Sequence, residues 1–377
     1  MGHWSFNHRR ENFVGRFVRV DCRRTPCCWF AMVFLCSVAG HVRADQQTIE
    51  VSPDKKGFVI APSGKSFVPW GNNYALDIMD RLAHDPARVE RDFAEMKAAG
   101  ANVARIHPEM PAFFGGPNEI DPGAIERLRS LLGIAQKNGM YLHITGLACY
   151  RVKQRMAWYD AEDEAHRWNT QALFWENIAK ACAASPGVFC YDLVNEPAAN
   201  GKPSDGWYTG RMGDYEFCQR LSLDPAKSSD DIFRTWTARM VASIRKYDKK
   251  HLITLGMLPF PGYYNSAAKQ LDFVSPHIYP ASKKVPDAID LLKKFDVGKP
   301  IEIGETFPLS CGVDDERKFL LESRTIAAGW IGHWPDDEPS KLRDLKKSGK
   351  ITPGQMLWLS WVELFREVGP SMTRSTP

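Results

Sequence analysis

The feature that most constrains this chain is a unit that repeats between residues 45 and 377. An apolar segment typical of a strand is followed by a loop and then by an amphipathic segment typical of a helix. Alternation of this kind predicts a parallel sheet with helical crossovers, an α/β fold. The expected strands lie at 66–75, 101–110, 140–150, 187–197, 251–260, 272–280, 300–307 and 330–337. Eight such units in about 330 residues predict a (β/α)8 TIM barrel.

The segments between these strands carry helix signals. Asp85 can cap a helix over 85–100, Pro86 suits its first position, and Gly100 closes it. Further helices are expected at 121–139, near 164–184, near 229–248, at 286–295, at 314–329 and at 353–368. Residues 47–62 predict a short N-terminal β-hairpin, and residues 198–228 a loop-rich excursion after the fourth strand. A doubly wound open sheet is the alternative, but it would usually show a glycine-rich phosphate loop after its first strand, which this chain lacks.

The first 44 residues differ from the rest of the chain. They contain seven arginines, two acids and no lysine, together with an uncharged apolar run at 27–40. That run is shorter than the roughly 20 residues of a membrane span. With Val42 and Ala44 as small residues at the cleavage site, the segment predicts a secretory signal peptide over 1–44. A secreted or periplasmic catalytic domain would then span 45–377, without stable membrane insertion; an uncleaved anchor is the alternative.

Charge and cysteine content narrow the classes of function. The whole chain carries +4, of which the first 44 residues contribute +5, so residues 45–377 carry −1. This balance gives no case for nucleic-acid binding. Five of the nine cysteines fall in 45–377 and none forms a CxxC pair, so we expect no zinc site, and no metal or organic cofactor. Cys182 and Cys190 lie in apolar elements and are expected in the core.

Polar residues gather at the predicted ends of the strands, where the chemistry of such barrels is found. Two glutamates stand out, Glu196 at the end of the fourth strand and Glu305 at the end of the seventh. Although 109 residues apart in sequence, they could face each other across the barrel mouth over one sugar ring. Glycoside cleavage needs such a pair, one carboxyl to protonate the leaving oxygen and one to attack the anomeric carbon.

The neighbouring strand ends offer side chains that could support this pair. Arg105 can keep Glu305 ionised, and Tyr279 can donate a hydrogen bond to the same carboxylate. Asn195 can bind a sugar 2-hydroxyl, and Trp334 offers an apolar face for a pyranose ring. Glu302 is the rival of Glu305, but strand alternation is expected to place it on the opposite face.

The motif "DLVNEP" is preceded by "VARIH" and followed by "PHIYP", "IEIGETF" and "WIGHW". In this order the motifs resemble those of glycoside hydrolase family 5, the cellulase-like enzymes of the retaining clan A barrels. The resemblance covers most of residues 60–340 and implies that Glu196 is the acid/base and Glu305 the nucleophile. It also implies substrate-binding or supporting roles for Arg105, Asn195, His277, Tyr279, Trp334 and Asn73. Many members end the third strand with an aspartate and a histidine, where this chain has Thr145 and Leu147.

Residues and resemblance together predict a retaining β-glycosidase. It would hydrolyse O-glycosidic bonds in a β-linked polysaccharide or oligosaccharide, of β-glucan or β-mannan type, by double displacement, and act as a monomer. Two alternatives stay open: a carbohydrate-binding barrel without turnover, and a transglycosylase that uses the same two glutamates. Trp207 and Tyr208, in the excursion after the fourth strand, are candidates for sugar stacking, and residues 150–164 for a further wall of the cleft.

Overall fold

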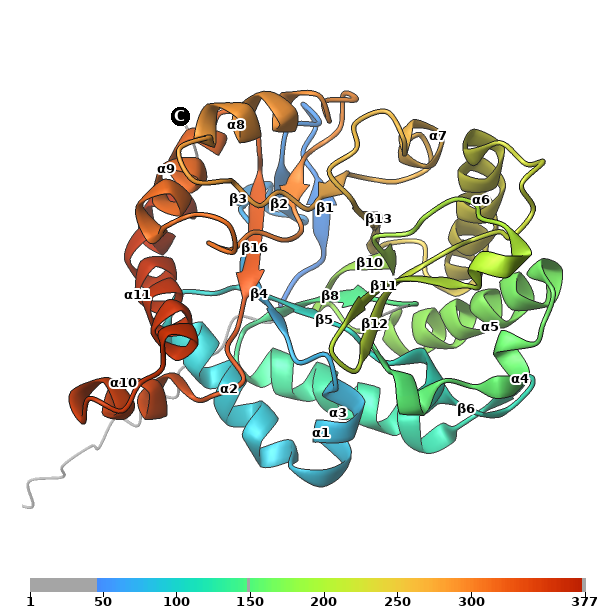
Figure 1. The fold of residues 1–377 in the computed structure, drawn as a ribbon, viewed down its shortest axis with the longest axis horizontal. Helices are drawn as coiled ribbons and strands as arrows, with labels where there is room; N and C mark the ends of the chain where they lie inside the picture. The colour runs from blue at the N-terminus through green and yellow to red at the C-terminus, as the bar shows by residue number, and fades with distance from the viewer. Residues whose placement is uncertain (1–45, 148–149, 375–377) are drawn as a thin grey trace, which may run out of the picture. The chain divides into compact units, whose positions relative to one another are not determined.

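A computed structural model describes residues 46–147 and 150–374, so the predicted signal peptide lies outside the described residues. Eight strands form the central sheet in the order β14-β13-β10-β8-β5-β4-β16-β15 (Figure 1). Every hydrogen-bonded pair in it is parallel, and bridges at Val274–Ile301 and His277–Glu305 connect its two ends. The predicted (β/α)8 barrel is therefore confirmed. Its strands are β4 (Trp70–Tyr74), β5 (Val103–Ile106), β8 (Tyr141–Thr145), β10 (Val188–Asn195), β13 (Leu252–Met257), β14 (Ser275–Pro276), β15 (Glu302–Ile303) and β16 (Gly329–His333).

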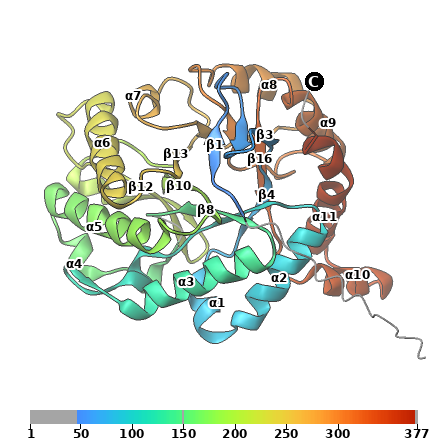
Figure 2. The same cartoon turned by 180° about the vertical axis from the view of Figure 1, so that it is seen from behind.

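Helices surround this sheet, as the views from both sides show (Figures 1 and 2). The Asp85 side chain caps α2 by accepting from the backbone N–H of Arg88, and Pro86 takes the first helical position, as predicted. The short helices α1, α4, α7 and α10 were not predicted from the sequence. The helices are α1 (Ile78–His84), α2 (Pro86–Ala98), α3 (Pro122–Lys137), α4 (Ala157–Asp160), α5 (Glu164–Cys182), α6 (Ser229–Tyr247), α7 (Asn265–Ala268), α8 (Val285–Lys293), α9 (Val313–Ser323), α10 (Pro339–Lys347) and α11 (Pro353–Met372).

The N-terminal hairpin is present, with one strand more than predicted. Strands β1 (Ile49–Val51), β2 (Phe58–Ile60) and β3 (Lys65–Phe67) form an antiparallel sheet. Residues 66 and 67, which we expected in the first barrel strand, belong to β3. The Phe58 ring packs edge-on against Phe189 and Phe273, both at 5.2 Å, next to the first residues of the barrel strands. This sheet therefore covers the N-terminal end of the barrel.

The excursion after the fourth barrel strand is more regular than predicted. It contains the hairpin of β11 (Tyr208–Met212) and β12 (Tyr215–Gln219), and β12 pairs with β9 (Tyr150–Arg151). A loop was expected because the apolar alternation is weak and the pairing with β9 spans about 65 residues, which sequence periodicity does not detect. A second hairpin joins β6 (Phe114–Gly116) to β7 (Glu119–Ile120).

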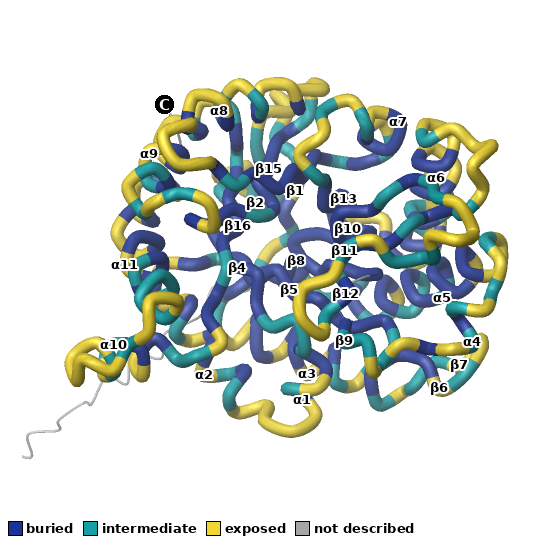
Figure 3. Tube along the Cα trace, viewed as in Figure 1, coloured by how far each residue is buried: buried dark blue, intermediate teal, exposed yellow. Residues whose placement is uncertain are grey.

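Burial follows the barrel architecture, with buried strands at the centre and exposed segments outside them (Figure 3). Apolar side chains fill the layer between strands and helices, and Cys182 and Cys190 are buried as predicted. Among the described residues, no helix combines the length and apolar character that crossing a membrane requires. The barrel interior is partly charged, because Arg105, Asp192 and Glu302 are all fully buried. Buried charges need partners, and these lead to the candidate site.

Candidate active site

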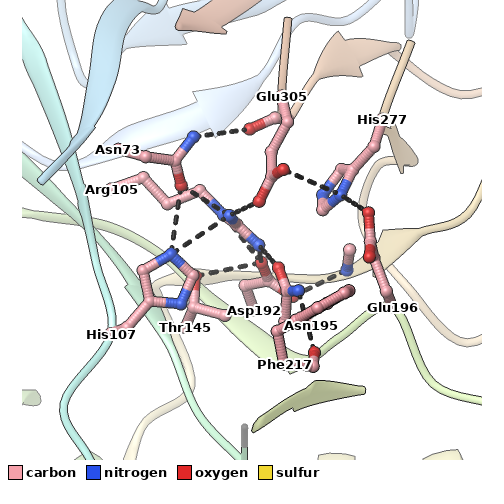
Figure 4. A network of polar contacts seen from close by, with 12 residues as sticks. Asn73, Arg105, His107, Thr145, Asp192, Asn195, Glu196, Phe217, His277 and Glu305 are labelled. Carbon is pink, nitrogen blue, oxygen red and sulfur yellow. Dashed lines mark hydrogen bonds and ion pairs between the residues drawn. The ribbon is translucent and has the colours of Figure 1, made fainter. Parts of the chain in front are cut away.

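Glu196 and Glu305 meet at the C-terminal end of the barrel. Glu196 directly follows β10, and a parallel bridge places Glu305 beside His277. One carboxylate oxygen of each glutamate and one ring nitrogen of His277 all lie within 4.8 Å of one another. The structure thus brings together residues from the fourth, sixth and seventh strands, as the sequence predicted (Figure 4).

Glu305 is surrounded by donors and positive charge. Arg105 Nη1 donates to Glu305 Oε1 at 2.7 Å, and the Tyr279 hydroxyl donates to Oε2 at 2.6 Å. Burial alone would raise the pKa of Glu305, but the charges of His277 and Arg105 outweigh burial and lower it. Glu305 is therefore a carboxylate at neutral pH, held by the two residues that we expected to hold it.

Arg105 lies at the centre of the polar network (Figure 4). It donates to Asp192 Oδ2 from Nη2 at 2.8 Å and from Nε at 3.1 Å, and to Asn195 Oδ1 at 2.8 Å. Burial would raise the pKa of Asp192, but Arg105 and His143 outweigh it, so the pKa is lowered. Asp192 was not among the residues predicted from the sequence, although an acid within an apolar strand is costly to bury without a cation.

Asn73 contacts Arg105, and its role in substrate binding stays a prediction. Its Oδ1 accepts from Arg105 Nη1 at 2.6 Å and lies 3.1 Å from His107 Nε2. Its Nδ2 donates to the carbonyls of Gly304 and Gly332 at 3.3 and 2.9 Å. Protein groups thus lie against both the oxygen and the nitrogen of the Asn73 amide. Asn73 therefore orients the guanidinium.

Glu196 has a different environment from Glu305. Its Oε1 lies 2.7 Å from His277 Nδ1, and the Cys218 thiol donates to its Oε2 at 3.5 Å. His277 Nδ1 is also 3.5 Å from Glu305 Oε2, so the imidazole lies between the two carboxylates. Nε2 of His277 is buried and has no hydrogen-bond partner among the described residues. Because Cys218 is in the excursion, its contact with Glu196 was not predictable from strand order.

Strand eight contributes a histidine that the sequence analysis did not single out. His333 Nε2 lies 2.9 Å from the Tyr279 hydroxyl and 3.8 Å from Glu305 Oε2, and 26% of the side chain is exposed. Trp334 follows it, packs in the main core and keeps only 7% of its surface exposed. Its backbone N–H donates to the Asn73 carbonyl at 2.9 Å. Trp334 is thus adjacent to the network, and its stacking on a sugar stays a prediction.

Glu302 also faces the barrel interior, contrary to the expectation from strand alternation. Its Oε2 lies 3.2 Å from His143 Nδ1 and 3.4 Å from Ser275 Oγ. Alternation fails because β15 ends at Ile303, before Glu305 is reached. Burial would lower the pKa of His143, but Glu302 and Asp192 outweigh it and raise it. The buried ring of His143 thus lies between two buried carboxylates, Asp192 and Glu302.

The three-stranded sheet β11-β12-β9, together with its ion pairs, forms one side of the barrel mouth. Arg151 in β9 donates to Asp77 Oδ2 at 2.9 Å, which joins the loops after the third and first strands. The Arg167 guanidinium lies 4.1 Å from the centre of the Trp207 ring, and the Tyr208 hydroxyl donates to Asp160 at 2.8 Å. Protein groups therefore already engage both aromatic residues that we considered for sugar stacking.

Glu196, His277 and Glu305 are also the one group of close potential metal ligands that the described part of the chain contains. Arg105 and Tyr279 already occupy both oxygens of Glu305, however, and a bound metal would lie against the guanidinium. The arrangement suits proton transfer and nucleophilic attack better than metal binding. Glu305 is held ionised, whereas the one close partner of Glu196 among the described residues is a ring nitrogen of His277.

Comparison with known proteins also indicates a glycoside hydrolase. The family model described as Cellulase (glycosyl hydrolase family 5) matches residues 55–294. No curated protein matches the chain. Among solved structures, the exo-β-1,4-mannosidase Op5Man5 from Opitutaceae bacterium strain TAV5 has a TM-score of 0.63 at 16% identity; the match covers 88% of this chain and 64% of that one.

Two further structures extend this comparison. The GH5_18 protein from Streptomyces cattleya, in complex with GlcNAc, has a TM-score of 0.60 at 15% identity and 82% coverage of both chains. The endo-1,4-β-mannanase from Rhizomucor miehei has a TM-score of 0.54 at 17% identity, with 76% of this chain and 90% of that one covered. At these identities the likeness to solved structures shows the fold alone.

Proposed function

Because this chain belongs to the cellulase family, glycosyl hydrolase family 5, and is a glycoside hydrolase, we propose that it cleaves β-glycosidic bonds with retention of anomeric configuration. The observation that carries the proposal is the separation of the two carboxylates. Their nearest oxygens lie within 4.8 Å. Retaining glycosidases keep the carboxyl groups about 5–5.5 Å apart, whereas inverting enzymes need about 6.5–9.5 Å to admit a water.

The different surroundings of the two glutamates support different proposed roles. Glu305 is held ionised and is the nucleophile, whereas Glu196, which has no cation as strong as Arg105 against it, is the acid/base. In the first step a Glu305 oxygen bonds to the anomeric carbon, the glycosidic C–O bond breaks, and the Glu196 proton passes to the leaving oxygen. In the second step Glu196 takes a proton from water, the water oxygen bonds to the anomeric carbon, and Glu305 is released.

Asn195 and His277 complete the proposed substrate contacts. Asn195 accepts from Arg105 and donates to the Phe217 carbonyl at 3.1 Å, which leaves one amide N–H and one lone pair. These can bind a sugar hydroxyl beside the anomeric carbon. His277 lies between the two carboxylates through Nδ1, and we propose that it lines the same part of the site.

For the substrate we propose a β-linked oligosaccharide or polysaccharide of β-mannan or β-glucan type. The printed names of two similar structures, an exo-β-1,4-mannosidase and an endo-1,4-β-mannanase, favour mannosides by analogy of fold. We further propose that the enzyme acts outside the cytoplasm, as a monomer. Assays on β-mannan, β-glucan and aryl β-glycosides, with analysis of product length, identify the sugar and separate endo from exo cleavage.

Two variants test the mechanism. Glu305→Ala is expected to lose nearly all hydrolysis, and Glu196→Ala to lose about 10²–10⁴-fold on a substrate with a poor leaving group. The exposed Glu119→Ala is the matched control and should keep wild-type rates. NMR of the first product should show the β-anomer.

Three outcomes would contradict the proposal. Near wild-type hydrolysis by both glutamate variants would exclude the assigned roles, and an α-anomer as first product would exclude retention. Oligosaccharide binding without turnover by the wild type would favour the binding barrel instead. Products longer than the substrate would indicate transglycosylation by the same residues.

A further inference from the structure

Strand β12 contacts the segment that carries Glu196 through three consecutive residues. The Phe217 carbonyl accepts from Asn195 Nδ2 at 3.1 Å, the Cys218 thiol donates to Glu196 Oε2 at 3.5 Å, and the Gln219 carbonyl accepts from the Ala198 N–H at 2.9 Å. Strand β12 is not part of the barrel. The proposed acid/base is therefore held from two sides, by the barrel and by the inserted hairpin.

The backbone at Glu196 needs this support. Its φ is +49°, in the left-handed region that residues other than glycine seldom adopt. Such a conformation costs on the order of 1–3 kcal/mol and persists only where surrounding contacts impose it. The Glu196 N–H donates to the Gly256 carbonyl at 3.0 Å, and the contacts of Asn195 and Ala198 with β12 fix the residues on either side.

The Cys218 side chain is suited to donate a hydrogen bond and unsuited to react. Only 5% of the residue is exposed. Burial, and then the Glu196 carboxylate, raise the pKa of the thiol, so it keeps its proton at neutral pH. The opposite strand leaves room for the sulfur only because residue 210 is glycine: a Cβ there would lie 2.7 Å from Cys218 Sγ.

The two oxygens of Glu196 have different partners. Oε1 faces His277, and Cys218 is the hydrogen-bond partner of Oε2 among the described residues. Without the thiol, the contact of Oε1 with His277 would be the one described side-chain contact left to oppose rotation of the carboxyl group about its last bond. Small errors in the orientation of a catalytic group are costly, because proton transfer needs alignment with the leaving oxygen.

We propose that Cys218 is a positioning residue for the acid/base, and that its S–H, carried by β12, fixes the orientation of the Glu196 carboxyl group. This inference rests on the proposed role of Glu196 in protonating the leaving group. It assigns to the inserted hairpin a part in catalysis, in addition to forming one side of the barrel mouth.

The test compares leaving groups. Cys218→Ala, Cys218→Val and Cys218→Ser are assayed on phenyl and 2,4-dinitrophenyl β-glycosides of the sugar that the wild type cleaves. For Ala and Val, kcat/KM on the phenyl glycoside should fall about 10–100-fold, because phenol needs protonation to depart. On the dinitrophenyl glycoside kcat/KM should stay within about twofold, while kcat falls because Glu196 must still deprotonate water. Cys218→Ser keeps a donor and should restore most of the phenyl activity.

Cys182→Ala is the matched control, since Cys182 is a buried thiol in helix α5 of the core. It should lower thermal stability without changing the ratio of rates on the two glycosides. Equal losses on both glycosides for Cys218→Ala and Cys218→Val, or no loss on either, would overturn the proposal. Cys218→Val fills most of the thiol volume, so it provides a folded variant if Cys218→Ala is unstable.

Glu196→Ala is assayed beside them to separate this inference from the mechanism. If Glu196→Ala shows the leaving-group dependence and the Cys218 variants do not, only the positioning role is wrong. If Glu196→Ala itself shows no such dependence, the proposed role of Glu196 fails, and the role of Cys218 fails with it.

Discussion

Two glutamates at the same end of the barrel, Glu305 partly buried and Glu109 fully buried, differ in whether they are ionised. Glu305 has Arg105 and Tyr279 within 2.7 Å, and its pKa is lowered. Glu109, three residues beyond β5, accepts only from the Met79 N–H at 2.9 Å, and its Oε1 has no partner among the described residues. Burial raises the pKa of Glu109 to about 8. The nearby cation decides whether such a carboxyl is ionised, as the proposed nucleophile is, or protonated.

The largest effect is expected when Glu305 loses its nearby cation and so becomes a carboxyl without one, like Glu109. Arg105→Met removes the cation and leaves Asp192 and Glu305 without it. We expect kcat/KM to fall on the order of 10³-fold, because the nucleophile loses its charge partner. Chemical unfolding should show a loss of about 3–5 kcal/mol, since a broken buried ion pair leaves charge uncompensated.

Arg167→Met is the control for that variant. Arg167 is also buried, but its guanidinium contacts the Tyr159 carbonyl at 2.9 Å, and no contact with Glu305 is present. It should lose stability with less than about tenfold loss of kcat/KM. If Arg105→Met kept wild-type kcat/KM, the guanidinium would not be what maintains Glu305 as a nucleophile.

The second prediction concerns Glu109→Gln, which removes the buried carboxyl group that has no cation beside it. The folded-state pKa of Glu109, about 8, lies above its ordinary 4.5. Its stabilising contribution is therefore complete below about pH 4.5 and is lost as the pH rises through 8. Between pH 5 and 9 the wild type should lose on the order of 3–5 kcal/mol that Glu109→Gln does not lose.

Urea unfolding at the two pH values measures this difference. The exposed Glu119→Gln, a change of the same chemistry, should lose stability as the wild type does. Parallel pH dependence for wild type and Glu109→Gln would show that Glu109 is not protonated in the folded protein.

The smallest effect is expected from removing a neutral hydrogen-bond donor to Glu305. Tyr279→Phe removes the hydroxyl at 2.6 Å and its contact with His333, while Arg105 stays in place. A hydrogen bond to a charged group contributes about 1.5–3 kcal/mol, so kcat should fall roughly 10–100-fold with little change in stability. A loss as large as that of Arg105→Met would mean that charge is not the main difference between Glu305 and Glu109.

Much of the fold was predictable because it depends on local patterns. Strand and helix periodicity, with caps such as Asp85, located the barrel units, and barrel geometry then placed Glu196 near Glu305. Asp192, Cys218 and His333 were missed for one reason. Each belongs to the site through a contact with a segment at least 22 residues away in sequence, and no local pattern encodes such contacts.

A local rule also misled at one position. Alternation placed Glu302 away from the interior, but the strand ends before Glu305 and alternation no longer applies. There the three-dimensional neighbours, rather than the residue type, determine what the side chain does.

By itself the sequence determined the barrel, the two glutamates and the family resemblance, because hydrophobic periodicity and the order of strand-end residues are properties of the sequence itself. Only the tertiary structure decided that Glu305 is held ionised, which polar residues already have partners, and that β12 contacts the segment that carries Glu196. The physical reason is that charge state and orientation depend on distances of a few ångströms between segments that the sequence separates by tens to hundreds of residues.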